Sequence, residues 1–119
     1  MELYKLSFCN VKVLQSDIAE VGVFEGVEVD LKMVKEIHQC FLSIFPHSFS
    51  LLINKSNSYS TQLDALIHFG TLPAIDKIAV FAPNKMAKLS ADFSAEIPSS
   101  AELNIQVFID RGEALTWLR

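Results

Sequence analysis

The stretch from residue 30 to residue 53, DLKMVKEIHQCFLSIFPHSFSLLI, decides the fold. Apolar residues recur every three or four positions over residues 30–45, which predicts a helix with one buried face. Asp30 can cap its first turn, and Pro46 stops it. Residues 49–53 then form a short, almost wholly apolar run that is typical of a buried strand. The face of this helix is formed by Leu31, Val34, Ile37, Phe41, Ile44 and Phe45.

Upstream of this helix, the sequence predicts a β-hairpin. Apolar residues occupy mostly alternate positions from Leu6 to Val13, with an irregularity at Cys9 and Asn10. A turn at residues 15–17 separates them from a second alternating run that ends at Val23. We therefore expect two antiparallel strands with one face turned inward and the other in water.

Downstream, helices and strands alternate. We expect a second helix with Leu63, Leu66, Ile67 and Gly70 on its buried side, opened by a capping box of Thr61 and Asp64. A strand at residues 75–82, a third helix, a loop at residues 94–102 and a strand at residues 103–109 follow. The third helix would bury Met86, Leu89 and Phe93, and a last helix would begin with a capping box of Asp110 and Glu113.

This order of elements predicts an α/β fold. It implies a mixed sheet of about five strands, with an N-terminal hairpin, a parallel part and about four helices packed on it. No Pro/Gly/Ser-rich linker, low-complexity tract or repeat divides the chain, so we expect one domain over residues 1–119.

Composition excludes several classes of protein. Half of the 119 residues are hydrophobic and the net charge is -4, which argues against a general nucleic-acid binder. The N-terminus lacks a signal-peptide pattern, and no apolar run approaches the roughly 18 residues of a membrane span. Cys9 and Cys40 lack the spacing of a zinc site or a disulfide scaffold. We expect two buried thiols in a reducing compartment, the cytoplasm.

The sequence contains no complete catalytic, metal or cofactor site. A zinc site needs three or four converging ligands, and the candidates are His38, Cys40, His47 and His68. His38 and Cys40 are two positions apart on a helix, so their side chains diverge by about 200°. There is no Gly-x-Ser-x-Gly elbow, and four glycines are too few for a phosphate cradle. We therefore expect no enzyme, no cofactor and no metal.

Acidic residues dominate residues 13–31, where there is no Lys or Arg. Asp17, Glu20, Glu25 and Glu28 fall there, beside the helix cap Asp30. Two explanations remain open at this point. Exposed strands need polar side chains, so these residues can simply form the wet face of the hairpin. Alternatively, they form a patch that steers a basic partner protein.

A polar loop follows the predicted strand at residues 49–53. Six of the eight residues from 54 to 61 are Ser, Thr or Asn, with Tyr59 among them. Capping of the next helix accounts for two or three of these positions. Ligands of open α/β sheets tend to bind at the carboxyl ends of strands, so this loop is also a candidate site.

Several segments together resemble a known family. They are LYKLSF and VKVL in the hairpin, IAEVGVFEGVEVDL before the first helix, LLINKSNSYS at the polar loop, the strand IAVFAPN and the closing VFIDRGEALTWL. Over nearly its full length, the chain resembles a small bacterial family with the STAS fold. That family is related to sporulation anti-anti-sigma factors and is described loosely as STAS or CRAL-TRIO-like.

The resemblance implies a regulatory role for the loop formed by Asn57, Ser58, Tyr59 and Ser60. Anti-anti-sigma relatives carry a phosphorylated serine, preceded by Asp, at the start of the equivalent helix. Ser58 corresponds to it, with Ser60 next, although Asn57 stands where the relatives have Asp. We expect both serines to be accessible, at or just before the first turn of the second helix.

At the level of the whole protein, the resemblance implies a non-catalytic module that binds a protein partner. It would form a homodimer through the edge of the N-terminal hairpin. The alternative is a carrier of small apolar ligands or lipids, as in the CRAL-TRIO fold. A carrier requires an apolar pocket of several hundred Å³.

Overall fold

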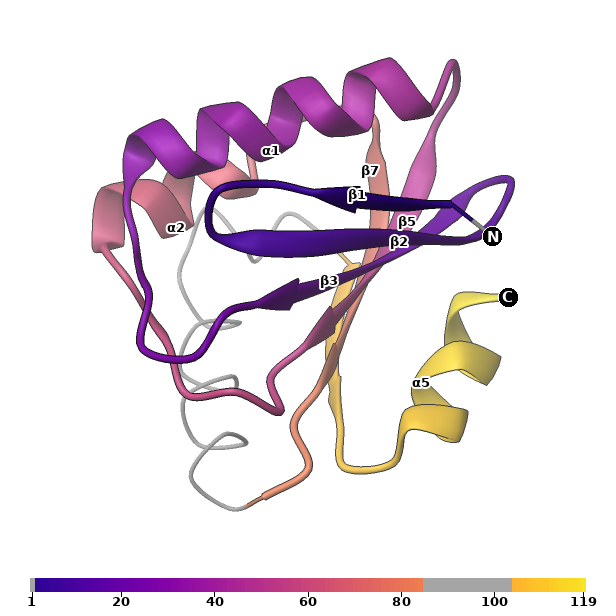
Figure 1. Cartoon of the computed structure of the whole chain (residues 1–119). Coiled ribbons are helices and arrows are strands. Elements are labelled where there is room, and N and C mark those ends of the chain that lie inside the picture. The colour runs from indigo at the N-terminus through magenta and orange to yellow at the C-terminus, as the bar shows by residue number, and fades with distance from the viewer. Residues whose placement is uncertain (1, 85–103) are drawn as a thin grey trace.

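The chain folds into a six-stranded mixed sheet with helices on both faces (Figure 1). The computed structural model describes residues 2–84 and 104–119. In chain order, the described elements are β1 (Leu3–Lys5), β2 (Cys9–Gln15), β3 (Ile18–Val23), β4 (Glu28–Val29), α1 (Leu31–Ile44), β5 (Phe49–Asn54), β6 (Ser60–Thr61), α2 (Leu63–Phe69), β7 (Ile75–Phe81), β8 (Asn104–Phe108) and α5 (Arg111–Leu118).

The strand order in the sheet is β1-β2-β3-β5-β7-β8. The pairs β1/β2 and β2/β3 are antiparallel, whereas β3/β5, β5/β7 and β7/β8 are parallel. The expected mixed sheet with an N-terminal hairpin is therefore confirmed, with six strands in place of about five. A separate two-residue parallel pair, β4 and β6, lies beside this sheet and joins two loops.

Helices α1 and α2 cover one face of the sheet, and α5 covers the other (Figure 1). The first face holds the larger core, in which Phe41 contacts Phe49 and Phe69, and Phe45 stacks on Phe49. The second face is thinner, and Ala79 and Ala114 are fully buried in it. Because side chains alternate along a strand, neighbouring residues of β5 such as Leu51 and Leu52 serve different faces.

Helix α1 forms where the apolar periodicity predicts it. The side chain of Asp30 accepts a hydrogen bond from the backbone N–H of Met33 at 2.9 Å, so the predicted cap is confirmed. Val34, Ile37 and Phe41 are buried on its sheet-facing side. The predicted cap of the last helix is also confirmed, since Asp110 accepts from the N–H of Glu113 at 2.9 Å.

The N-terminal hairpin contains one strand more than expected. The irregularity at Cys9 and Asn10 is the start of β2, and the residues before it turn back to form β1. The N–H of Leu6 donates to the carbonyl of Cys9 at 2.9 Å and closes this turn. The hairpin of β2 and β3, with its turn after Gln15, is confirmed.

The expected start of the second helix is wrong, and its expected buried face is right only for Leu66 and Gly70, which are partly buried. Helix α2 begins at Leu63 after the cap residue Gln62, which makes no side-chain cap bond, while Thr61 belongs to β6. Asp64 instead accepts from the N–H of Ala65. Leu63 and Ile67 are 61% and 40% exposed, because the helix turns Ala65 inward. The expected third helix and the loop after it lie outside the described residues.

Candidate functional site

The polar loop from Asn57 to Ser60 lies against the connection between β3 and β4. The N–H of Gly26 donates to the carbonyl of Ser58 at 2.7 Å, and the N–H of Ser60 donates to the carbonyl of Val27 at 3.0 Å. Gly26 has a φ of 80°, a left-handed conformation that glycine adopts without steric cost. Two segments more than 30 residues apart in the chain are thus held together by their backbones.

Side chains strengthen the same junction. The amide of Asn57 donates to the carbonyl of Val23 at 3.0 Å, and the N–H of Ser58 donates to the carboxylate of Glu25 at 3.0 Å. Ser58 and Ser60 are both exposed. Neither hydroxyl makes a hydrogen bond with another described residue. Within the described residues, the loop therefore presents two hydroxyls without a hydrogen-bond partner, on a backbone that is held by other atoms.

The position of the two serines differs from the expected one. Ser58 precedes β6 and Ser60 lies within it, so neither belongs to the first turn of α2. Their expected exposure is found, but their hydroxyls do not cap the helix. The backbone of Ser58 contacts the carboxylate of Glu25, and Ser58 does not lie at the positive end of a helix.

The four acidic residues do not form one patch. Asp17, Glu25 and Glu28 are exposed, and Asp17 lies in the turn between β2 and β3, away from the loop. Glu28 accepts a hydrogen bond from the side chain of Gln62 at 2.6 Å. Glu20 is turned inward, with a side chain that is 12% exposed. The loop junction thus gathers Glu25 and Glu28, and the other two acids lie elsewhere.

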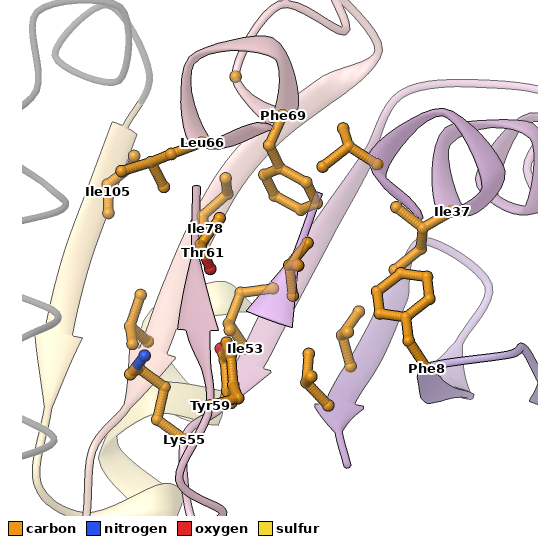
Figure 2. A pocket seen from close by; sticks show the side chains of 16 residues that line it. Phe8, Ile37, Ile53, Lys55, Tyr59, Thr61, Leu66, Phe69, Ile78 and Ile105 are labelled. Atoms are coloured by element: carbon orange, nitrogen blue, oxygen red, sulfur yellow. The ribbon is translucent and has the colours of Figure 1, made fainter. Parts of the chain in front are cut away.

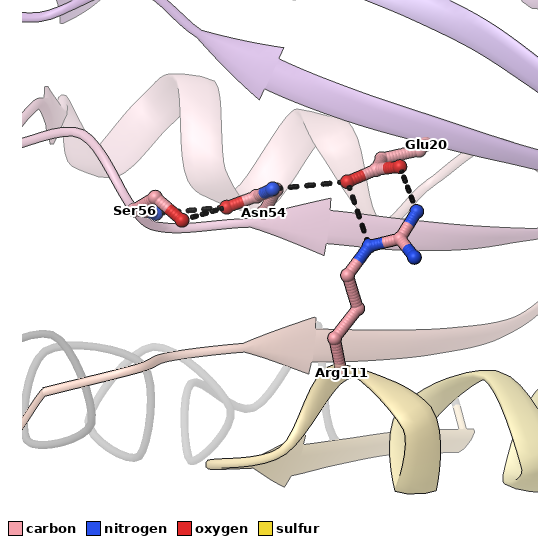
Figure 3. A network of polar contacts seen from close by, with 4 residues as sticks. All are labelled: Glu20, Asn54, Ser56 and Arg111. Carbon is pink, nitrogen blue, oxygen red and sulfur yellow. Dashed lines mark hydrogen bonds and ion pairs between the residues drawn. The ribbon is translucent and has the colours of Figure 1, made fainter.

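Glu20 belongs to a polar network that joins three elements (Figure 3). Its carboxylate pairs with Arg111 of α5 at 2.5 Å and accepts from the amide of Asn54, at the end of β5, at 2.9 Å. The carbonyl oxygen of Asn54 in turn accepts from the N–H and the hydroxyl of Ser56. This chain of bonds connects the helix on one face of the sheet to the polar loop.

The network sets the ionisation of Glu20. Burial favours the neutral acid, but the hydrogen bonds from Arg111 and Asn54 outweigh it and lower the pKa of Glu20 below its ordinary value. The carboxylate is therefore charged at neutral pH and paired within the protein. An internally paired acid is a poor contact for a basic partner, so the partner-facing assignment made for Glu20 from the sequence loses its support.

A pocket of about 120 Å³ lies between α1, α2 and the sheet (Figure 2). Its walls are mostly aliphatic and aromatic. The lining side chains that carry a polar group are Lys55, Tyr59 and Thr61, all from the segment that contains the polar loop. Figure 2 shows Lys55 and Tyr59 side by side at one end, and the Lys55 ammonium lies 4.1 Å from the centre of the Tyr59 ring. This distance is that of a cation–π contact.

Burial shifts both of these polar groups toward their neutral forms. It lowers the pKa of Lys55 and raises the pKa of Tyr59. No carboxylate of a described residue pairs with the Lys55 ammonium. The polar pattern of the sequence around Tyr59 hid this site, because six polar neighbours indicate an exposed loop rather than a side chain turned inward.

Among the histidines and cysteines, His38 and Cys9 are buried in the core. His38 is buried, its Nε2 donates to the carbonyl of Phe69 at 3.2 Å, and its ring lies 5.3 Å from that of His68. Cys9 is fully buried, and burial raises its pKa to about 12. Cys40 is only partly buried, contrary to expectation. No cluster of three or more His, Cys, Asp or Glu in residues 2–84 and 104–119 could hold a metal ion.

Nearly the whole chain is similar in fold to a solved structure. A protein of Shewanella loihica PV-4, described as an uncharacterized protein from the DUF3478 family with a SpoIIAA-like fold, superposes with a TM-score of 0.58. The match covers 93% of this chain and 92% of that chain, at 14% sequence identity. This chain has a SpoIIAA-like fold. The STAS-type architecture implied by the sequence resemblance is thereby confirmed.

At this level of identity the SpoIIAA-like fold is what the two proteins share. No family model matches the chain, and no curated protein matches it significantly. None of the helices in the described part of this SpoIIAA-like domain is long and apolar enough to cross a membrane.

Proposed function

We propose that this SpoIIAA-like domain is a non-catalytic regulatory module that binds a partner protein through the loop formed by Asn57, Ser58, Tyr59 and Ser60. One observation carries the proposal. The loop holds two exposed serines, whose hydroxyls make no hydrogen bond to any residue that the structure describes, on a backbone fixed to the β3–β4 connection. Because the backbone of this loop is already held in place, the loop loses little conformational entropy when it binds a partner.

The same geometry provides a switch. A phosphate on Ser58 would add roughly -1.5 to -2 charges beside the carboxylate of Glu25. Repulsion between the two would weaken the bond from the Ser58 N–H to Glu25 and change the sign and shape of the surface. Modification of Ser60 would act further along, on β6, where it would alter charge without opposing Glu25. Ser58 is therefore the stronger candidate acceptor.

Glu25 and Glu28, both exposed beside the loop, give the partner-facing side a negative charge. A basic protein surface is the complementary one, and the charge would raise the rate of encounter more than the final affinity. On the basis of the STAS resemblance, we further propose that the protein is bacterial and cytoplasmic and that it forms a homodimer through the edge strand β1.

The test begins by capturing the partner at a defined position. A photo-reactive amino acid replaces Asn57 in the loop or, as a control, Gln39 on the exposed side of α1, and crosslinked proteins are identified from the native host. The partner is then purified, and its affinity is measured by calorimetry for wild type, Ser58→Asp, Ser60→Asp and the control Ser16→Asp in the β2–β3 turn.

We expect crosslinks from position 57 and a change in affinity of about tenfold or more for Ser58→Asp, with Ser16→Asp unchanged. Thermal stability should stay nearly constant in all three variants because each position is exposed. Crosslinking from position 39 alone, or equal affinities for the loop variants and the control, would contradict the proposal.

A second candidate function, a carrier of small apolar ligands, is favoured by the pocket of about 120 Å³. This volume is smaller than the several hundred Å³ expected for a carrier of lipids. It fits a much smaller molecule, and native mass spectrometry of the purified protein would detect such a ligand if it is retained.

A further inference from the structure

The pocket between α1, α2 and the sheet has the features of a binding site for a small amphipathic anion. Its aliphatic and aromatic walls come from both helices and from strands β3, β5, β7 and β8. A volume of about 120 Å³ is a little less than that of an engineered, dry cavity that binds benzene, at about 150 Å³. An apolar body of roughly five or six carbons therefore fits, and an acyl chain of lipid length does not.

Lys55 supplies the charge. Its ammonium is half-buried at one end of the pocket over the ring of Tyr59, and no carboxylate of a described residue neutralises it. The Tyr59 ring offsets part of the cost of desolvating this ammonium, and a bound anion would offset more of it. Tyr59 and Thr61 also line the pocket, and the hydroxyl of neither makes a hydrogen bond with a described residue. Three polar side chains thus line an otherwise apolar space.

We propose that this pocket binds a small organic carboxylate, with its apolar body against the pocket walls and its carboxylate on the Lys55 ammonium. The alternative, a packing defect, accounts for the space but not for the lysine. An aliphatic side chain at position 55 would fill a defect without the cost of desolvating a cation. A carboxylate also matches the geometry of a charge-assisted hydrogen bond better than a neutral ligand.

This inference rests on the second candidate function and deepens it by naming the chemical class of the ligand. The pocket shares Tyr59 with the partner-binding loop, but Ser58 and Ser60 do not line it. The two requirements, an apolar body of limited size and a negative charge, can be tested separately.

The experiment is an NMR titration of ¹⁵N-labelled protein at neutral pH with hexanoate, hexanol and hexylamine, followed by decanoate. The amides of Ile53, Tyr59 and Thr61 report on the pocket. We expect saturable shifts with hexanoate, weaker binding of hexanol and none of hexylamine. Decanoate should bind no more tightly than hexanoate, because its chain exceeds the volume.

Lys55→Met tests the charge, because methionine keeps most of the length and apolar stem of lysine. We expect the dissociation constant of hexanoate to rise about tenfold in this variant and that of hexanol to stay nearly unchanged. The matched control is Lys77→Met. Lys77 also lies over an aromatic ring, that of Trp117 at 5.4 Å, but on the α5 face of the sheet. It should bind both ligands as the wild type does.

The outcomes distinguish the assignment of a carboxylate ligand from the more general carrier function. If hexanol binds as tightly as hexanoate, or if Lys55→Met leaves hexanoate binding unchanged, the carboxylate assignment is overturned while the carrier function stands. If none of the four compounds shifts the pocket amides, both are overturned. Affinity that rises steadily up to decanoate would show non-specific hydrophobic binding and would also overturn the inference.

Discussion

At the scale of single residues, the partly buried Glu20 and the buried His38 link the stability of this domain to pH in known directions. Glu20 is held in its charged form by Arg111 and Asn54, whereas His38 is held in its neutral form by the core around Phe69. Both shifts arise from contacts between elements that are distant in the chain. Each can therefore be measured as a change in folding stability.

For Glu20 we predict that Glu20→Gln lowers the free energy of unfolding by about 1–2 kcal/mol at pH 7, because Arg111 is partly exposed and the pair is partly screened. The pKa of Glu20 is lowered in the folded state, so its contribution is complete above the unfolded pKa of about 4.3 and is lost as pH falls. Urea unfolding at pH 7 and pH 3 should show the deficit of the variant shrinking at pH 3. Asp76→Asn, at an exposed position of β7, is the control and should change little. A deficit of equal size at both pH values would refute the assignment.

The pKa of His38 is also lowered in the folded state, but the cause is burial rather than pairing with a charge. This shift too makes the domain less stable at low pH. Burial lowers its pKa, the hydrogen bond to Phe69 opposes this, and a charge on His68 lowers it further. The unfolded chain thus binds a proton below pH of about 6.5 when the folded chain does not, so stability falls as pH drops from 7.5 to 5. We predict that His38→Gln, which can still donate to Phe69, flattens this dependence.

The measurement is again urea unfolding, at pH 7.5 and pH 5. His47→Gln serves as its control because His47 is exposed, and it should keep the slope of the wild type. An unchanged slope in His38→Gln would locate the titrating group elsewhere.

At the scale of elements, α1 carries the packing of the larger core. Phe41 is fully buried and contacts two further aromatic rings, whereas the next residue, Leu42, is 50% exposed. We predict that Phe41→Ala lowers the unfolding free energy by about 3–5 kcal/mol and Leu42→Ala by less than about 1 kcal/mol. Thermal or urea unfolding of the two neighbouring variants provides the comparison, and similar losses would mean that α1 is rotated from its described orientation.

The elements also show what the sequence could predict. Helix α1 was predictable from its apolar periodicity, and α5 from its capping aspartate. Strand β5 was predictable because a short, almost wholly apolar run is typical of a buried strand. Strands β1, β4 and β6 were not, since two or three residues carry no measurable alternation. The predicted face of α2 was only partly right, because periodicity does not show that the small Ala65 is buried while Leu63 and Ile67 are exposed. The pair of Glu20 and Arg111, 91 positions apart, is visible only in the folded chain.

At the scale of the whole molecule, stability should decrease from the centre of the sheet outward. Strand β5 lies between β3 and β7 and is buried on both faces, whereas β1 is a three-residue strand at the sheet edge. In native-state hydrogen exchange we predict that the amides of Leu51 and Leu52 open only with global unfolding, and that those of β1 exchange by local opening.

The same measurement tests the proposed homodimer. Protection of β1 that matches that of β5, and that falls when the protein is diluted, would indicate that a second copy pairs with this edge. Fast exchange of β1 at every concentration would contradict a dimer through the hairpin edge.

In a mutational scan, the two faces of the sheet should also tolerate different kinds of substitution. Where α5 lies on the sheet, Ala79 and Ala114 are fully buried and any larger side chain must push the helix away. Where α1 lies, large aromatic rings fill the space, and exchanges among large apolar residues of similar volume keep it filled. Selection acting on this protein would therefore restrict size on one side of the sheet and conserve total volume on the other. Related sequences would be recognised more reliably by their small residues behind the sheet than by the identity of their aromatic ones.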